Sequence, residues 1–298
     1  MYVKAHCFLE NARIDKVPIF FNFGDTTVQI TNTPKRGETD EGMEIEITQK
    51  IEPTEIQVSK DEMDEKGFFI AQRLKKYKSK LQEVAFLIEG LLSVKYNVKV
   101  PPFNTGKVMV NVYPESEEER KMLNEGIVSR GFGDIFTPEK KIEFQWKDDV
   151  MGDINLARQH LPALSFFAQA LRSQERGDQE IAFFLFFRIL EGYFGDGSGH
   201  SEKSFIQNKN ELSKYLKYDD RIKSAFKKIL QEILKLPSKS KDNFEGLLSD
   251  IVLLRHKLTH FDANHSDRYF SPDLRFELDI INKYLRIATL LLIRNKIG

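Results

Sequence analysis

The chain has 298 residues, of which 41% are hydrophobic, and this length suits one large domain or two ordinary domains with buried cores. Its 45 Lys and Arg residues balance 45 Asp and Glu residues, and it contains 24 Phe. This composition excludes a disordered chain and a strongly basic protein that coats nucleic acid. The single cysteine, Cys7, excludes an intramolecular disulfide framework and argues against zinc-finger and iron–sulfur sites.

The apolar runs of the chain are short. Residues 288–293 form one of the longest, and a bilayer-spanning helix needs about 20 such residues. The first residues lack the apolar core and small-residue cleavage site of a signal peptide. We therefore expect a cytoplasmic protein without a membrane partner.

The first half of the chain has mainly strand patterns. Apolar and polar residues alternate in short segments, and two apolar runs flank Gly24-Asp25 as in a β-hairpin. Apolar residues at helical spacing predict one long helix, and Ser116 followed by three Glu residues is typical of a capping box. The expected strands cover residues 2–9, 19–23, 26–31, 43–48, 98–112 and 142–146, and the expected helices cover residues 68–95 and 116–124.

From about residue 153 the strand patterns end and helical spacing takes over. We predict an α+β N-terminal domain over residues 1–150 and an all-α domain over residues 151–298, with a four-helix up-and-down core and a helical insertion. The expected helices cover residues 154–171, 179–194, 205–216, 221–234, 244–259 and 273–296, with a loop over residues 260–272.

Basic residues concentrate in one stretch of the second half. Residues 203–241 contain 11 Lys and Arg but only 4 Asp and Glu. Such a run indicates either an electrostatic footprint for RNA or, more commonly, a solvated helical face. The candidate RNA-binding residues are Lys203, Lys209, Lys214, Lys217, Arg221, Lys223, Lys227 and Lys228.

The most informative motif closes the helix expected over residues 244–259. Arg255 offers a planar cation that binds phosphate through two hydrogen bonds, and His260 offers a group that transfers protons near neutral pH. With His256 beside them, they form a set able to hold a phosphodiester and activate an attacking hydroxyl. A five-residue step turns about 140° beyond one helical turn, so Arg255 and His260 converge only if the helix ends near Thr259 or another chain contributes. The plainer interpretation is a basic helix end favoured by the helix dipole.

A metal site is a competing interpretation of the same segment. His256 and His260 lie four residues apart on one helix face, and Asp262 and His265 follow closely. However, Lys257 lies between the two histidines, where the hydrolytic zinc motif has Glu. This alternative predicts a metal-dependent hydrolase.

Two charged residues, Arg188 and Glu191, interrupt the aromatic stripe of the helix expected over residues 179–194. A carboxylate and a guanidinium in apolar surroundings need partners. Either Glu191 orients a catalytic Arg or His, or the two residues form an internal or interfacial ion pair. The aromatic side chains themselves are expected to form core or a dimer face.

These features resemble the HEPN (higher eukaryotes and prokaryotes nucleotide-binding) domain over roughly residues 153–298. That family has an α-helical bundle in which an Arg and a His, separated by four to six residues, lie near the end of the third core helix. Arg255 and His260 match the shortest such spacing. The segment around Arg188 and Glu191 resembles the second helix of ApeA-like members. More loosely, the whole chain resembles the MauJ-like methylamine-utilisation proteins.

The resemblance implies a metal-independent endoribonuclease that uses no cofactor and works as a homodimer through the HEPN helices. Arg255 would contact the scissile phosphate, His260 would act as acid or base on the ribose 2′-hydroxyl, and His256 would assist. RNA is the implied substrate, with phage defence or toxicity as the context and an antitoxin or defence-system protein as a further partner. Asp262 departs from the toxin subset, in which a Tyr follows two residues after the His.

Other HEPN proteins have lost catalysis. The alternative expectation is therefore an inactive HEPN-like module for binding or dimerisation. In either case the N-terminal domain would be a sensor or a substrate-selecting module.

Overall fold

The computed structural model describes two compact units, which together contain every described residue. The sheet unit comprises Met1–Glu89 and Pro101–Asn155, and the helical unit comprises Gly90–Val100 and Leu156–Gly298. Helix α1 (Gln72–Tyr96) contributes to both. The described residues are 1–10, 12–15, 17–34, 41–52, 72–97, 99–100, 103, 109–123, 142–144, 154–196, 201–239, 243–259 and 271–298.

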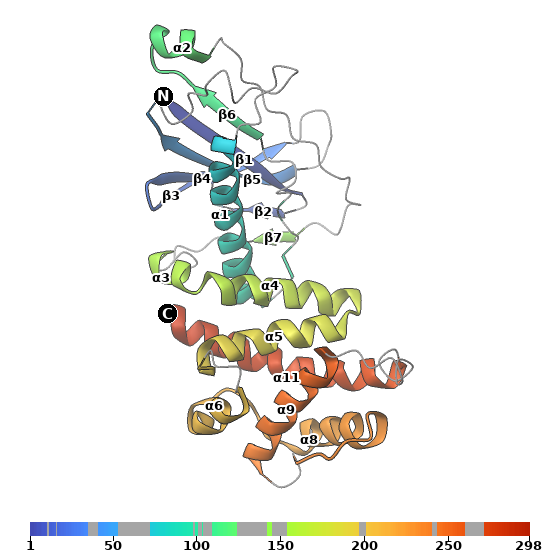
Figure 1. The fold of residues 1–298 in the computed structure, drawn as a ribbon. Helices are drawn as coiled ribbons and strands as arrows, with labels where there is room; N and C mark the ends of the chain where they lie inside the picture. Colours follow the sequence, from blue (N-terminus) through green and yellow to red (C-terminus); the bar gives the residue numbers. More distant parts are fainter. Residues whose placement is uncertain are drawn as a thin grey trace, which may run out of the picture. The chain divides into compact units, whose positions relative to one another are not determined.

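The sheet unit is built on a five-stranded antiparallel sheet in the order β3-β4-β5-β1-β6 (Figure 1). The predicted hairpin is confirmed, with Gly24 at a φ of 64° in its turn. Of the strand expected over residues 98–112, the structure describes a strand from Met109, while residues 99, 100 and 103 are not in a strand and the other residues before 109 lie outside the described residues. The strands of this sheet are β1 (Tyr2–Glu10), β3 (Ile19–Phe23), β4 (Thr26–Pro34), β5 (Glu41–Lys50) and β6 (Met109–Tyr113), and β2 (Ala12–Ile14) pairs in parallel with β7 (Ile142–Phe144).

One face of the sheet forms the core of this unit. Alternate residues of neighbouring strands are buried on it, as the period of two requires. Tyr77 of α1 packs in the same core, in a cluster with Met1, Val3 and Ile51. The buried residues of the sheet face include Val3, Ala5 and Cys7 of β1, Val28 and Ile30 of β4, and Met43, Ile45 and Ile47 of β5.

The single cysteine, Cys7, is buried in this core. Burial, together with the charges of Glu89 and Glu44, raises the pKa of the Cys7 thiol, so this cysteine is not an activated nucleophile.

The predicted capping box opens α2 (Glu117–Leu123), because Ser116 Oγ accepts the backbone N–H of Glu119 at 3.1 Å.

The helical unit contains three long helices that lie side by side, α4, α5 and α11, while α9 runs obliquely and packs on α5, α6 and α8 (Figure 1). The four long helices are therefore not all aligned as a simple up-and-down bundle would have them. The elements are α3 (Ile154–Gln159), α4 (Leu161–Arg176), α5 (Gln179–Phe194), α6 (Ser201–Gln207), α7 (Lys209–Leu212), α8 (Asp220–Lys227), the π-helix η5 (Lys228–Ile233), α9 (Phe244–Thr259) and α11 (Pro272–Ile297).

The single helix expected over residues 154–171 is wrong. The chain breaks at His160 into α3 and α4, and Pro162 lies in the first turn of α4. Proline is tolerated there because that turn has no intrahelical partner for its backbone N–H groups. The break sets the position of the His160 side chain, which contacts Tyr193 of α5.

The aromatic stripe of α5 is core, as one of its two interpretations predicted. Phe183, Phe186 and Phe187 are all almost fully buried. Phe186 packs edge to face on Phe167 of α4, and the rings of Phe187 and Phe205 of α6 are 5.6 Å apart between centroids. The stripe therefore joins α5 to α4 and α6.

In the described part of the chain, no helix has the length and apolar character to cross a membrane.

The segment before α9 is held firmly against this helix. Asp250 is buried, and its carboxylate accepts hydrogen bonds from Ser238 Oγ at 2.7 Å and from the backbone N–H of Lys239 at 3.0 Å. One turn earlier, Gly246 lies so close to Lys239 that a Cβ added to it would be 2.0 Å from the Lys239 carbonyl oxygen. Only glycine permits this approach of the two backbones.

We predict that Gly246→Ala destabilises the helical unit by about 1–3 kcal/mol, because the new methyl group forces the two segments apart. Gly192→Ala is the matched control, since a Cβ on Gly192 of α5 meets no atom within 4 Å. That substitution should stabilise the protein by up to about 1 kcal/mol through helix propensity. Thermal and urea unfolding of the full chain measure both effects. Equal stabilities for the two variants would contradict the close contact.

Candidate active site

The last turn of α9 presents Arg255 and His256. The helix extends to Thr259, as predicted, and the Thr259 hydroxyl donates to the carbonyl oxygens of Arg255 and His256, each at 2.9 Å. The His256 carbonyl is one of the last four of α9, which have no partner within the helix, so this hydrogen bond satisfies it. Arg255 is half-buried and His256 is exposed.

The guanidinium of Arg255 lies over the ring of Phe187 of α5, with its carbon 5.5 Å from the ring centroid. Phe187 is buried, so this cation–π contact joins the end of α9 to the middle of α5. Within the described ranges, Arg255 has no carboxylate at ion-pair distance. A guanidinium has five N–H donors in one plane, a geometry that is able to bind an oxyanion.

Glu191 lies on α5, one helical turn beyond Phe187. One of its oxygens accepts from Arg188 at 2.7 Å, and the other accepts from Ser201 Oγ of α6 at 2.6 Å. The two residues therefore form an ion pair, but the Arg188 side chain is 57% exposed, so the pair is not an internal one. Glu191 also fixes the start of α6 against α5, on the side of α5 that bears the Phe187–Arg255 contact.

Several predicted site residues lie outside the described residues. These include His260, which follows α9 directly, and the alternative metal ligands Asp262 and His265. Of the four residues in the metal hypothesis, the structure describes His256. Among all described residues, no cluster of three or more His, Cys, Asp or Glu is arranged to hold a metal ion.

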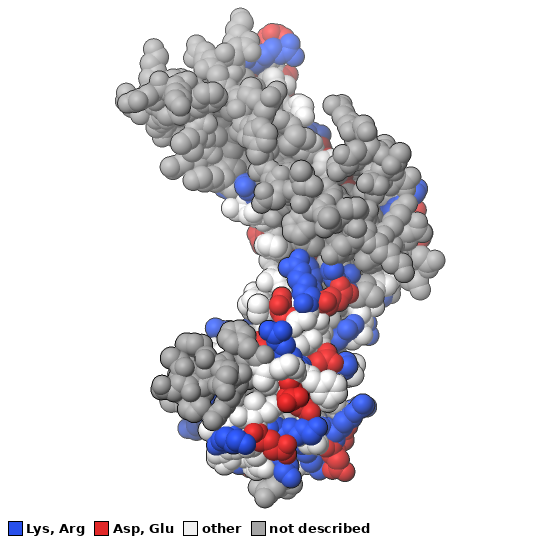
Figure 2. All heavy atoms as spheres, turned by 90° about the vertical axis from the view of Figure 1, so that its right-hand side faces the viewer, with Lys and Arg blue, Asp and Glu red and all other residues white. Residues whose placement is uncertain are grey.

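The eight basic residues proposed to bind RNA fall into two groups of four. The first group forms ion pairs: Lys209 with Glu245, Lys214 with Glu211, Lys223 with Asp220, and Lys228 with Glu277. The second group has no carboxylate at ion-pair distance in the described part of the chain: Lys203, Lys217, Arg221 and Lys227. The lower half of Figure 2, where the helical unit lies, shows basic and acidic side chains interspersed on one face. The local charge is therefore smaller than the composition of the stretch indicated.

One histidine contact was not predicted. His160, at the break between α3 and α4, shares a hydrogen bond of 3.1 Å with the hydroxyl of Tyr193 on α5. Burial and, to a smaller extent, the charge of Lys296 lower the pKa of His160, while burial raises the pKa of Tyr193 to about 12. Both groups are thus kept neutral near pH 7. No sequence motif joins two residues 33 positions apart, so only the fold reveals this pair.

We predict that His160 titrates below the value of about 6.5 that histidine has in an unfolded chain. At a pH between the pKa of His160 in the folded protein and its pKa in the unfolded chain, the unfolded chain binds more protons. The free energy of unfolding therefore falls as the pH is lowered through this range. NMR titration of the histidine ring protons measures the midpoint. Lys296→Ala should raise it, because one of the two causes is removed. A wild-type midpoint at or above 6.5 would contradict this environment.

Comparison of the chain with protein-family models, with curated proteins and with solved structures finds no match.

Proposed function

We propose that this protein is a metal-independent endoribonuclease of the HEPN type, whose catalytic residues are Arg255, His260 and His256. The observation that carries the proposal is the Arg255 guanidinium, which lies over the ring of Phe187 and has no carboxylate at ion-pair distance among the described residues. The contact with the ring and the lack of an ion-pair partner in the described ranges both favour binding of a phosphate by this guanidinium.

The chemistry follows from the residue types. Arg255 holds the scissile phosphate and stabilises the charge that develops on its oxygens. His260 removes the proton from the ribose 2′-hydroxyl, whose oxygen attacks the phosphorus, while the 5′-oxygen leaves and takes up a proton. The products are a 2′,3′-cyclic phosphate and a 5′-hydroxyl. His256, exposed in the same helical turn as Arg255, assists in positioning the RNA.

Because His260 acts as the base, a second group must act as the acid that donates a proton to the leaving 5′-oxygen. In a homodimer formed through the helical units, a second motif would supply it, and Arg255 and His260 of one chain would then not need to share a helix face. RNA and a second copy of the chain are therefore the proposed partners. A role in phage defence or as a toxin, with an antitoxin or defence-system partner, belongs to the same proposal, as do cytoplasmic location and a sensing role for the sheet unit.

The second candidate is an inactive HEPN-like binding module. It is favoured by the contacts of Glu191, whose two oxygens are occupied by Arg188 and Ser201 and which therefore has a structural role. The contact of Arg255 with Phe187 also stabilises the packing of α9 on α5 without any catalysis.

The decisive test is cleavage of RNA in the presence of EDTA. We expect the wild-type protein to cut RNA and the variants Arg255→Ala and His260→Ala to lose activity by about 100-fold or more. Removal of a single general acid–base group or of a single oxyanion contact lowers the rate by about this factor. Arg255→Lys should be nearly as impaired as Arg255→Ala, because an ammonium group lacks the planar pair of donors.

Arg275→Ala is the matched control, since Arg275 is an exposed arginine of α11 that lies 3.8 Å from a carboxylate oxygen of Glu180. Cutting that disappears in EDTA would support the metal-dependent hydrolase instead. Equal cutting by all variants would assign the activity to another site, and absence of cutting together with RNA binding would favour the binding module.

A further inference from the structure

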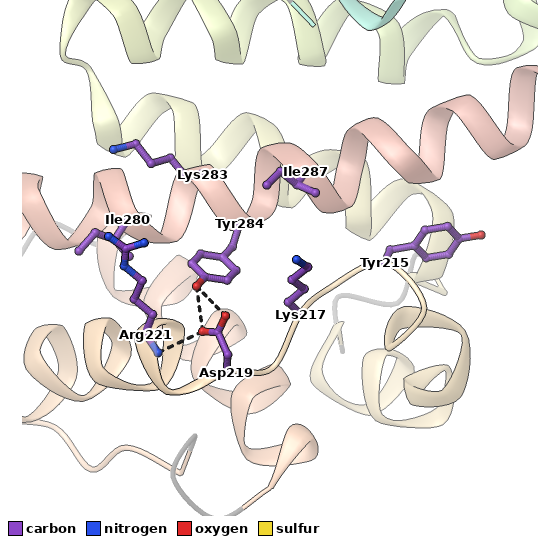
Figure 3. A pocket seen from close by; sticks show the side chains of 8 residues that line it. All are labelled: Tyr215, Lys217, Asp219, Arg221, Ile280, Lys283, Tyr284 and Ile287. Atoms are coloured by element: carbon purple, nitrogen blue, oxygen red, sulfur yellow. Dashed lines mark hydrogen bonds between the residues drawn. The ribbon is translucent and has the colours of Figure 1, made fainter.

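A pocket of about 360 Å³ opens in the helical unit between the segment preceding α8 and the exposed side of α11 (Figure 3). Its size lies within the range of small-molecule sites. Its lining combines aromatic, aliphatic and basic side chains with a single carboxylate. These residues are Tyr215, Lys217, Asp219, Arg221, Ile280, Lys283, Tyr284 and Ile287.

The carboxylate of the pocket is already fully engaged. The Tyr284 hydroxyl donates to both oxygens of Asp219, each at 2.8 Å, and Asp219 Oδ1 accepts the backbone N–H groups of Arg221 and Ile222 at the start of α8 (Figure 3). Burial raises the pKa of Asp219, but the hydrogen bonds from Tyr284 and the two amides outweigh it and lower the pKa. Asp219 thus serves as the N-cap of α8 and fixes the ring of Tyr284.

Two cations flank this fixed ring. Figure 3 shows Lys217 on one side of Tyr284 and Arg221 on the other, both reaching toward α11. Neither has a carboxylate at ion-pair distance within the described ranges, whereas the nearby Lys214 and Lys223 are paired with Glu211 and Asp220. Lys283 of α11 also lines the pocket, but it pairs with Asp279 at 2.6 Å, so Lys217 and Arg221 are the lining cations without a carboxylate at ion-pair distance among the described residues.

The wall formed by α11 is mainly apolar, and Lys283 is its charged residue. Ile280, Tyr284 and Ile287 follow one another at helical spacing on the side of α11 that faces the pocket, and Ile287 is 44% exposed. An exposed aliphatic and aromatic surface beside cations without an ion-pair partner in the described ranges suits a ligand with a flat apolar part and an anionic group.

We infer that this pocket binds a nucleoside phosphate, with the base against Tyr284 and Ile287 and the phosphate at Lys217 and Arg221, the cations that flank this ring. The ligand is either a free nucleotide or one nucleotide of a single-stranded RNA, since the two offer the same base and phosphate. The site does not depend on cleavage by Arg255 and His260, and it would hold the strand in place if that cleavage takes place.

Binding is measured by fluorescence anisotropy and calorimetry with the full-length protein. The ligands are AMP, inorganic phosphate, and single-stranded and duplex oligomers of 2′-O-methyl RNA. These oligomers lack the 2′-hydroxyl nucleophile, so binding is separated from cleavage. We expect AMP or the single strand to bind better than phosphate or duplex. Tight binding of the single strand that AMP does not compete for would assign the site to RNA, and binding of AMP alone would assign it to a free nucleotide.

The variant Lys217→Ala/Arg221→Ala should lose affinity by about tenfold or more and show a weaker salt dependence. Its matched control is Lys214→Ala/Lys223→Ala, which removes the same charge from residues already paired with carboxylates and should change affinity by less than about threefold. Tyr284→Leu removes the aromatic face and should weaken binding of AMP by about fivefold or more.

Equal losses in the two double variants would overturn the inference, because general electrostatics would then explain binding. Phosphate binding as tight as AMP binding would overturn the role of the base. Absence of binding of both AMP and the single strand would overturn the site as a whole, whatever the outcome of the cleavage test.

Discussion

The contact between the Arg255 guanidinium and the Phe187 ring is the interaction on which the candidate active site depends. It joins the end of α9 to the middle of α5, and the same ring packs on Phe205 of α6. Because Phe187 is part of the core, the position of Arg255 is set by the packing of the whole helical unit. A guanidinium held in this way loses little conformational entropy when it binds an oxyanion, which is what a phosphate-binding group needs.

The helical unit has a second group of cations at the pocket of Tyr284. There the negative group, Asp219, caps the N-terminus of α8, and Lys217 and Arg221 have no carboxylate at ion-pair distance among the described residues. In both places, cations without such a partner in the described ranges lie near an aromatic ring. This combination is typical of proteins that bind single-stranded nucleic acid.

Helical periodicity predicted the bounds of α9 and those of α5, and turn chemistry predicted the β3–β4 hairpin. The break at His160 was missed because apolar spacing continues across Pro162, where proline begins a new helix instead of interrupting one. The charge of the region around α8 was overestimated for a different reason. Its lysines pair with Glu245 and Glu277, which lie 36 and 49 residues away, and composition cannot reveal such pairs.

The central claim is that Arg255 and His260 promote attack by the ribose 2′-hydroxyl. The most direct test is the chemical analysis of the RNA ends that the wild-type protein produces in EDTA. Attack by the 2′-oxygen predicts a 2′,3′-cyclic phosphate, or the 3′-phosphate derived from it, together with a 5′-hydroxyl. Products with a 3′-hydroxyl and a 5′-phosphate would show that water is the nucleophile and would contradict the mechanism.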